Sequence, residues 1–223
     1  RKEIETQHYF QPISERLREK PDDSLLSALV NTVIEDWGRP LNDNELQAEM
    51  MADIFVGGSE TTTNAISAGV KLLIENPMAW EQMQSDPDRY LKVSIEEVLR
   101  LESPVQSLMR ATAKDVELSG VTIPAGSLIN IRFAAANRDE RRFDNPDALD
   151  LDRPRAGGHM AFGSGKHHCL GAPLARRELH WSFKALVDRI DAMWFAEVKN
   201  DFSYHPHYLL RAKKPLHIEF KAK

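Results

Sequence analysis

One glycine-rich stretch, residues 162–178, carries the only cysteine of the chain, Cys169. Gly163, Gly165 and Gly171 lie around it and let the backbone enter positive φ and approach a flat surface without a Cβ in the way. From residue 172 to 190 the chain has helical spacing, with a proline in the first turn. The pattern therefore predicts a sulfur on a tight loop at a helix N-terminus, where backbone N–H groups and the helix dipole favour a thiolate.

The composition is that of an ordinary globular protein, with 42% hydrophobic and 28% charged residues among 223. A net charge of −5 without a basic block argues against a general nucleic-acid binder. The sequence contains no apolar run of about eighteen residues, so it predicts no membrane span. A single cysteine cannot form an internal disulfide, which fits a reducing compartment and favours a cytoplasmic location.

A second long segment is predicted to be a helix of roughly thirty residues, about 45–50 Å long and able to cross a whole domain. It begins at Asn42, where Glu45 completes a capping box, and ends at Asn76 before a proline. Its middle contains two glycines and the threonines of residues 61–63, which are poor helix formers. Local conflicts of this kind are expected at functional sites.

The remaining periodicity predicts helices followed by short strands. We expect the polar segment 137–158, which is long for a loop, to have a packing function. The expected helices cover the chain up to about residue 33 and residues 78–84, 89–101 and 172–190. Strands are expected in 115–131, around turns at residues 119–120 and 124–126, and residues 202–210 and 216–220 are expected to form a terminal β-hairpin region.

The sequence gives little support to three candidate functions of the cysteine stretch. A zinc site needs three or four ligands at suitable spacing, and only one Cys/His cluster exists. A phosphate loop is excluded because Met160 occupies the position of the motif's first glycine, and the residue after Lys166 is a histidine instead of Ser or Thr. A Cys/His nucleophile stays open, although a histidine beside the sulfur in sequence is not thereby placed to take its proton. The reading we favour is a thiolate that binds a metal beneath a planar cofactor.

The run from Phe162 to Gly171, Phe-Gly-Ser-Gly-Lys-His-His-Cys-Leu-Gly, resembles the haem-binding loop of the cytochrome P450 family. The resemblance implies a mainly α fold with small β-sheets: a long central helix, a helix pair with a Glu-x-x-Arg motif, β-hairpins, and the cysteine loop with its following helix. It implies haem b as cofactor, with Cys169 as axial iron ligand. Cofactor-binding roles are implied for Cys169, His167, Arg110, Phe162, Gly163, Gly165 and Gly171, with His167 and Arg110 on the haem propionates.

Two further motifs match the same family. Glu97 and Arg100 resemble its Glu-x-x-Arg pair, which faces one side of a helix and joins a loop arginine, here Arg153; these three are expected to be structural. The run Gly57-Gly-Ser-Glu-Thr-Thr resembles the oxygen-binding groove of the central helix. The resemblance implies room for dioxygen at Gly57, a hydroxyl donor at Thr61 and proton supply through Glu60.

The substrate pocket is less defined. Asp53 is expected one turn before Gly57 on the same face, and we hypothesise that it orients a polar or cationic substrate group; a carboxylate turned toward solvent is an equal alternative. The resemblance suggests the other pocket candidates, which are of mixed polarity and name no substrate: Val56, Val105, Gln106, Leu108, His207 and Tyr208.

The implied function is a bacterial-type monooxygenase that activates dioxygen with electrons from a redox partner and hydroxylates or epoxidises a small organic substrate. The face of the cysteine loop away from the substrate pocket is expected to be positive. This suggests docking of an acidic electron donor such as a ferredoxin or flavodoxin. The residues concerned are Lys166, His168, Arg176 and Arg177.

The resemblance also has a gap, because nothing in residues 1–223 matches the N-terminal half of the family. We expect the chain to be one domain, the C-terminal part of a cytochrome P450 domain, and residue 1 not to be the natural start. Two alternatives therefore remain: a truncated fragment that binds haem poorly and is inactive, or a haem-binding sensor or carrier that does not oxygenate.

Overall fold

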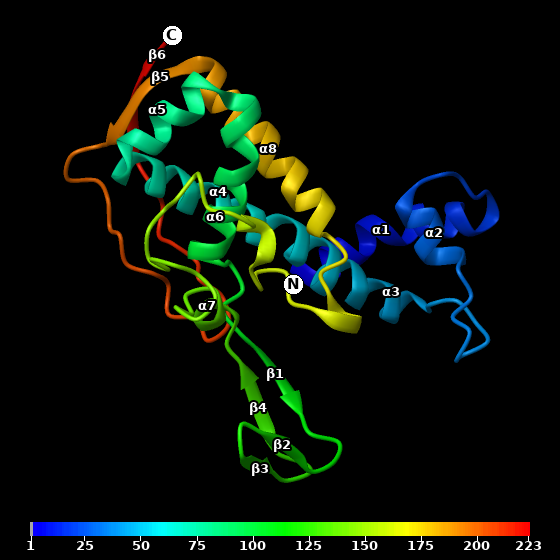
Figure 1. Cartoon of the computed structure of the whole chain (residues 1–223). Coiled ribbons are helices and arrows are strands. Elements are labelled where there is room, and N and C mark those ends of the chain that lie inside the picture. The colour runs from blue at the N-terminus through cyan, green and yellow to red at the C-terminus, as the bar shows by residue number, and fades with distance from the viewer. Residues whose placement is uncertain (1) are drawn as a thin grey trace. The chain divides into compact units, whose positions relative to one another are not determined.

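The computed structural model describes residues 2–223, apart from the side chains of residues 2, 3 and 52. Helices dominate the described chain, and three two-stranded antiparallel sheets accompany them (Figure 1). The predicted class, mainly α with small sheets, is confirmed. Internal contacts divide the chain into two compact units, one up to Ser59 and one from Glu60 onward.

The first unit contains α1 (Lys2–Glu19), α2 (Leu25–Asn31) and α3 (Asp43–Glu49). Its small core consists of Leu17, Val30, Leu46 and Met50, which are all buried. The predicted capping box is present at the start of α3: the Asn42 side chain accepts from the backbone N–H of Glu45 at 3.0 Å, and the Glu45 carboxylate accepts from the Asn42 N–H at 2.9 Å.

The predicted long helix is not uniformly α-helical. Residues Met50–Val56 form a π-helix between α3 and α4 (Gly57–Glu75). In a π-helix each N–H bonds five residues back, so the following side chains are turned around the axis relative to an α-helix. Asp53 therefore lies in the π-helical segment and Gly57 is the first residue of α4, so the spacing between them is not the regular α-helical spacing on which the sequence prediction relied.

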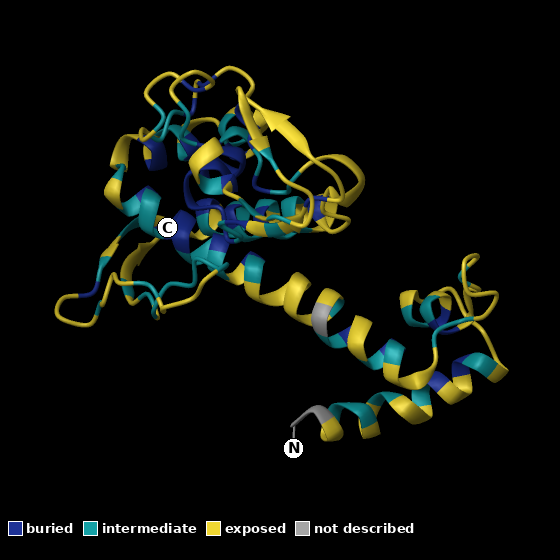
Figure 2. Ribbon diagram, turned by 90° about the horizontal axis from the view of Figure 1, so that it is seen from below, coloured by how far each residue is buried: buried dark blue, intermediate teal, exposed yellow. Residues whose placement is uncertain are grey.

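The second unit is built on α4, α5 (Pro77–Ser85), α6 (Pro87–Glu102) and α8 (Ala172–Arg189). The buried faces of these helices make one core, and its fully buried members include Leu73, Met83, Val98, Leu179 and Phe183. Figure 2 shows the buried residues of this unit in its interior, with exposed loops and strands around them. The Asp86 carboxylate caps α6 by accepting from the N–H of Arg89 at 3.1 Å.

The predicted turns of the β region are present. Strand β2 (Val116–Leu118) pairs with β3 (Val121–Ile123) around Ser119 and Gly120, which both have positive φ, as a tight hairpin requires. Strands β1 (Leu108–Ala111) and β4 (Leu128–Ile131) form the second sheet. Helix α7 (Phe133–Ala136) follows β4.

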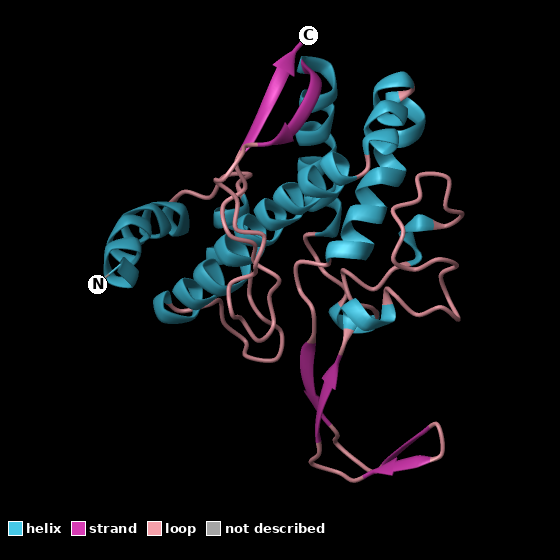
Figure 3. Ribbon diagram, turned by 90° about the vertical axis from the view of Figure 1, so that its left-hand side faces the viewer, coloured by secondary structure: helices cyan, strands magenta, loops and turns pink. Residues whose placement is uncertain are grey.

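The last sheet differs from the sequence prediction. Strand β6 (Ile218–Ala222) pairs with β5 (Ile190–Phe195), directly after α8, and not with residues 202–210 (Figure 3). Residues 202–210 make only isolated bridges, from Tyr204 to Lys213 and from Leu210 to Val105. Pro206 lies within this segment and has no N–H to donate to a ladder, which disfavours a regular strand there.

A buried ion pair joins α6 to the long loop 137–158. Glu97 and Arg100 have no exposed side-chain surface. The guanidinium of Arg100 donates from Nε and Nη2 to the two carboxylate oxygens at 2.7 and 2.8 Å. Its remaining N–H groups donate to three loop carbonyls, those of Asn137, Pro146 and Ala148. The loop therefore has the packing role expected from its sequence.

Arg153 completes this network from inside the loop. Its Nε lies 3.0 Å from Glu97 Oε1, but the N–H is not aligned for a hydrogen bond. Its Nη atoms donate to the carbonyls of Asp144 and Ala148. Two guanidinium groups thus share one buried carboxylate, and the loop carbonyls supply the further negative dipoles that two buried cations need.

We predict that Glu97→Gln strongly destabilises the chain, because it leaves two buried cations without their counter-ion. The expected loss is about 3–5 kcal/mol in the free energy of unfolding, measured by urea denaturation. Asp152→Asn is the matched control, since it breaks an ion pair with Arg89 whose two side chains are 56% and 61% exposed. That change should cost at most about 1 kcal/mol. Equal losses in the two variants would contradict the assigned importance of the buried network.

Close packing of α4 against α8 gives a second prediction. A Cβ on Gly69 would lie 2.4 Å from the ring of Phe183, which is completely buried and has no room to move. Gly69→Ala should therefore destabilise the chain by about 1–3 kcal/mol. Gly58→Ala in the same helix meets no atom within 4 Å, so it should stabilise by about 0.5–1 kcal/mol. Thermal unfolding of both variants tests the difference in sign.

Candidate functional site

The cysteine loop has the compact geometry that its glycines predict. Gly163 and Gly165 have φ of 67° and 73°, in the left-handed region. The N–H of Cys169 donates to the Phe162 carbonyl at 2.9 Å, which closes the loop, and a 3₁₀ turn, η3 (Gly165–His167), lies inside it. Helix α8 begins at Ala172, three residues after the sulfur, as predicted.

The surface of this loop suits an apolar group with an anionic edge. Cys169 is a free, exposed thiol, and the neighbouring Leu170 is 97% exposed, although a leucine is usually buried. A Cβ on Gly165 would meet no atom within 4 Å, so the backbone presents a bare face there. A thiolate ligand beside exposed apolar surface fits a haem as its planar partner.

An exposed histidine and an exposed arginine are available for the propionates of such a group. His167 lies on the loop itself and is exposed. Arg110 is exposed on β1, opposite Ile129 of β4, and its guanidinium donates to the Met109 carbonyl of its own strand at 2.8 Å. The ring of Phe133, in α7 directly after β4, would lie 3.8 Å from a Cβ on Gly163. The sheet that carries Arg110 is thus connected to the cysteine loop through α7.

The residues expected to handle oxygen lie at the start of α4. Gly57 is its first residue, and a Cβ there would meet nothing within 4 Å. Glu60 is exposed and Thr61 is half-buried. The adjacent Thr62 is buried, and its hydroxyl donates to the Glu178 carboxylate on α8 at 3.0 Å. This bond fixes the Thr61 turn of α4 against the helix that follows Cys169.

The structure brings two groups of pocket candidates together. The Gln106 N–H donates to the Leu209 carbonyl at 2.7 Å, and Val105 bridges Leu210. His207 Nδ1 accepts from the N–H groups of Leu209 and Leu210, which leaves its ring proton on Nε2. Tyr208 contacts the sulfur of Met109 through its hydroxyl at 3.4 Å, next to the exposed Leu108.

A charged cluster holds this second segment in place. Glu102, at the end of α6, is buried and accepts from Arg211 at 3.0 Å and from the Tyr204 hydroxyl at 3.2 Å. Lys213 lies 3.3 Å from the same carboxylate, and both cations also stack on the Tyr204 ring. The segment that carries His207 and Tyr208 is therefore anchored on α6 at its base.

Asp53 and Val56 belong to the first unit, and both are exposed. Asp53 is not an isolated carboxylate, because its side chain shares a hydrogen bond with Glu49, and this bond raises the pKa of Glu49. A carboxyl pair thus stands where the sequence indicated a single acid.

One contact alters the positive surface on which the sequence predicts that an electron donor docks. Lys166, His168 and Arg177 are exposed, as expected. Arg176, however, is only 36% exposed in its side chain and forms a two-point ion pair with Glu96, at 2.6 and 3.0 Å. Its charge is neutralised within the fold, so Arg176 is not an available surface cation.

Several residues of the site were missed from sequence. No local sequence pattern distinguishes Glu96 from its neighbour Glu97. Only the structure shows that Glu96 contacts His159 and Arg176, on either side of the cysteine loop. The three successive threonines were noticed, but the link from Thr62 to Glu178 joins residues 116 positions apart. No periodicity indicates a contact at such a distance in sequence.

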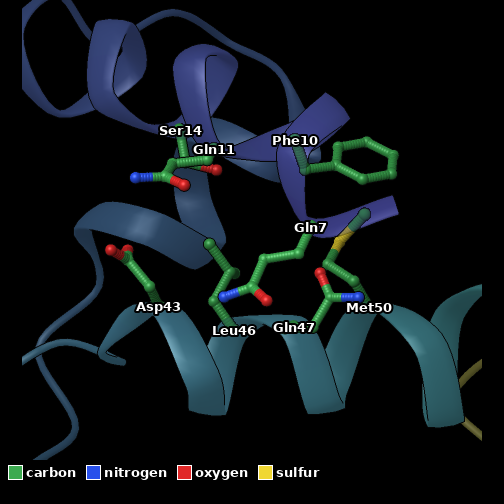
Figure 4. Close-up of a pocket in the computed structure, with 8 residues that line it drawn as sticks. All are labelled: Gln7, Phe10, Gln11, Ser14, Asp43, Leu46, Gln47 and Met50. Atoms are coloured by element: carbon green, nitrogen blue, oxygen red, sulfur yellow. The ribbon is translucent and has the colours of Figure 1, made fainter. Parts of the chain in front are cut away.

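The first unit has a small cavity between α1 and α3, of about 20 Å³ (Figure 4). The buried hydroxyl of Ser14, which has no hydrogen-bond partner, borders it. A cavity of this size holds one water molecule and no organic substrate. The lining residues are Gln7, Phe10, Gln11, Ser14, Asp43, Leu46, Gln47 and Met50.

Similar proteins of known sequence include two bacterial enzymes. Vitamin D(3) 25-hydroxylase of Pseudonocardia autotrophica is 45% identical over 171 residues, which are 76% of this chain and 41% of that protein. Cytochrome P450 107B1 of Saccharopolyspora erythraea is 38% identical over 211 residues, 94% of this chain and 51% of that protein. The chain thus spans about half the length of the curated relatives it matches.

A solved structure is similar over almost the whole chain. The crystal structure of CYP109E1 from Bacillus megaterium in complex with testosterone has a TM-score of 0.85 and 33% sequence identity, and the match covers 97% of this chain and 58% of that one. None of the described helices is long and apolar enough to cross a membrane. The family model for Cytochrome P450 matches residues 3–220. The chain belongs to the cytochrome P450 family.

Proposed function

We propose that this chain is the C-terminal part of one cytochrome P450 domain and carries the thiolate half of a haem monooxygenase site. The observation that carries the proposal is the exposed thiol of Cys169 on a loop closed by its own backbone N–H. Haem b, when bound, supplies the activation of dioxygen with electrons from a redox partner. The substrate is a small organic molecule that is hydroxylated or epoxidised.

Each residue then has a defined task. Cys169 would hold the haem iron through its sulfur, while Gly163, Gly165 and Gly171 would let the loop, closed at Phe162, approach the cofactor. His167 and Arg110 hold the propionates by charge-assisted hydrogen bonds. On α4, the space beside Gly57 admits dioxygen, the Thr61 hydroxyl donates a hydrogen bond there, and Glu60 passes protons inward from its exposed position.

The substrate would contact the two chain segments that are joined by the Gln106–Leu209 hydrogen bond. Val105, Gln106 and Leu108 lie in one segment, and His207 and Tyr208 lie in the other, so the lining is partly apolar and partly polar. The free Nε2–H of His207 is a donor for a substrate oxygen. A substrate-contacting role for Val56 and Asp53 is also part of the proposal, with Asp53 as a selector of cationic groups.

The electron donor is a ferredoxin or flavodoxin type protein in this proposal. Lys166 and Arg177 supply exposed positive charge near the cysteine loop, where His168 is also exposed, on a chain with a net charge of −5. Such a patch attracts an acidic partner at low ionic strength. A cytoplasmic location belongs to the same proposal.

The ligation of haem is tested by the carbon monoxide difference spectrum of the reduced, haem-loaded chain. We expect the Soret band of a thiolate-ligated haem, and we expect Cys169→Ser to lose it because a neutral hydroxyl cannot replace the thiolate. Ser164→Ala, a small change in the same loop, is the control and should keep the band. Absence of haem uptake by the unchanged chain would support an inert fragment, and a thiolate band without reductant-coupled product would support a sensor.

The role of Asp53 is tested with ligand-induced difference spectra of the haem-loaded chain. Asp53→Leu should weaken binding of small aromatic amines about tenfold, which corresponds to about 1.4 kcal/mol, and leave neutral aromatics of the same size unchanged. Asp36→Leu, on an exposed turn of the same unit, is the control for the lost charge. Unchanged amine affinity in Asp53→Leu would exclude the selector role.

A further inference from the structure

Glu96 is a buried carboxylate on α6 that contacts one residue before the cysteine loop and one residue after it. It is 6% exposed. From the segment before the loop, His159 Nε2 lies 3.0 Å from Glu96 Oε2. From the helix after the loop, Arg176 donates through Nε to Oε1 at 2.6 Å and through Nη2 to Oε2 at 3.0 Å. One carboxylate therefore receives three donors from residues 17 positions apart in the sequence.

The histidine contact is directional. Nδ1 of His159 accepts from the backbone N–H of Ala161 at 3.1 Å, so this nitrogen carries no proton. The proton of the neutral ring is then on Nε2, and it is donated to Glu96. His159 is 8% exposed, so water does not compete strongly for these bonds. The backbone at Ala161, next to Phe162, is thereby tied to α6.

The arginine contact reaches the other end of the loop. The Arg176 guanidinium lies over the ring of Phe162, 4.6 Å from its centroid. The carbonyl of Phe162 accepts the N–H of Cys169 at 2.9 Å. Arg176 thus connects the buried carboxylate to the residue that closes the loop. The hydrogen bond to Glu96 is the main cause that raises the pKa of Arg176, and the charge of Cys169 adds to it, so the two side chains are electrostatically close.

The carboxylate stays charged over the working range of pH. Burial alone would raise the pKa of Glu96, but the hydrogen bonds from His159 and Arg176 outweigh burial and lower this pKa to about 2. Gly157 leaves room for the arrangement, since a Cβ there would lie only 3.3 Å from Glu96 Oε2. The contact is therefore a permanent ion pair and not a switch.

We propose that Glu96 is a positioning residue for Cys169. Its bonds to His159 and Arg176, which we call the brace, join the two sides of the cysteine loop to one point on α6. The brace holds the loop in the closed conformation in which the sulfur is exposed. Glu96 affects the order of the cysteine loop even when no ligand is bound. Its consequence for haem ligation rests on the proposed function, and the two parts have separate readouts.

Loop order is measured by hydrogen–deuterium exchange of peptides covering residues 160–170 in the full chain without haem. Arg176→Gln should make this segment exchange about tenfold faster, because the closed loop loses its link to the carboxylate. Arg176→Lys keeps the charge but not the two-point fork and should recover part of the protection. Lys184→Gln is the matched control on α8; it removes an exposed pair with Asp188 and should leave the loop unchanged.

Glu96→Gln tests the centre of the brace directly and should give the same loop exchange as Arg176→Gln. Peptides of β5 and β6 report global unfolding. If these peptides also exchange faster in Glu96→Gln, that variant has lost the fold, and the test of the proposal rests on Arg176→Gln. Unchanged exchange of residues 160–170 in a folded Arg176→Gln variant would overturn the proposal.

The consequence for ligation is read from the carbon monoxide spectrum of the haem-loaded variants. Arg176→Gln should shift part of the population from the thiolate-ligated band to a band without thiolate, and Lys184→Gln should not. If the unchanged chain gives no thiolate band but loop exchange still rises in Arg176→Gln, the proposed function fails and the brace stands. If the thiolate band is present and exchange is unchanged, the brace fails alone.

Discussion

The burial of carboxylates on α6 is the constraint on which the second unit depends. Glu97 has no exposed surface and faces two guanidinium groups, those of Arg100 and Arg153. A buried charge is tolerated only with a partner and a full set of hydrogen bonds, so the loop 137–158 must wrap around this site to supply its carbonyls. An irregular segment thereby acquires one conformation, although it has almost no regular secondary structure.

Neighbouring acidic residues on the same helix organise other loops in the same way. Glu96 joins the two ends of the cysteine loop, and Glu102 anchors the segment that carries His207 and Tyr208. Helix α6 therefore supplies one carboxylate for each irregular part of the proposed site. Ion pairs of this kind are specific in geometry because the arginine fork fits a carboxylate in two parallel bonds.

The exposed parts of the molecule have the complementary character. Cys169 and Leu170 are exposed on a glycine-rich loop, and the side chains of Arg110 and His167 are exposed as well. Residues that hold the loop are buried and mutually satisfied, whereas those that would contact a cofactor are exposed. This division is the arrangement expected of a preformed binding site, in which the supporting contacts are complete before a ligand arrives.

Much of this could be predicted from the sequence because it depends on neighbouring residues. The capping box at Asn42, the hairpin turn at Ser119 and Gly120 and the helix after Cys169 follow from local backbone chemistry. The π-helix at Met50–Val56 and the pairing of β5 with β6 could not be predicted in this way. Hydrophobic periodicity does not distinguish an α-turn from a π-turn over seven residues, and strand pairing is a choice among partners far apart in the chain.

The sequence by itself determined the family, the cysteine loop and the Glu-x-x-Arg pair, because each depends on short runs of residues with defined spacing along the chain. Only the tertiary structure decided which charges are used up within the fold. Arg176 and Arg177 are adjacent in sequence, yet the first is committed to Glu96 and the second is exposed. The reason is physical: whether a cation is free depends on the carboxylate that packing brings within about 3 Å of it, and sequence spacing does not encode that distance.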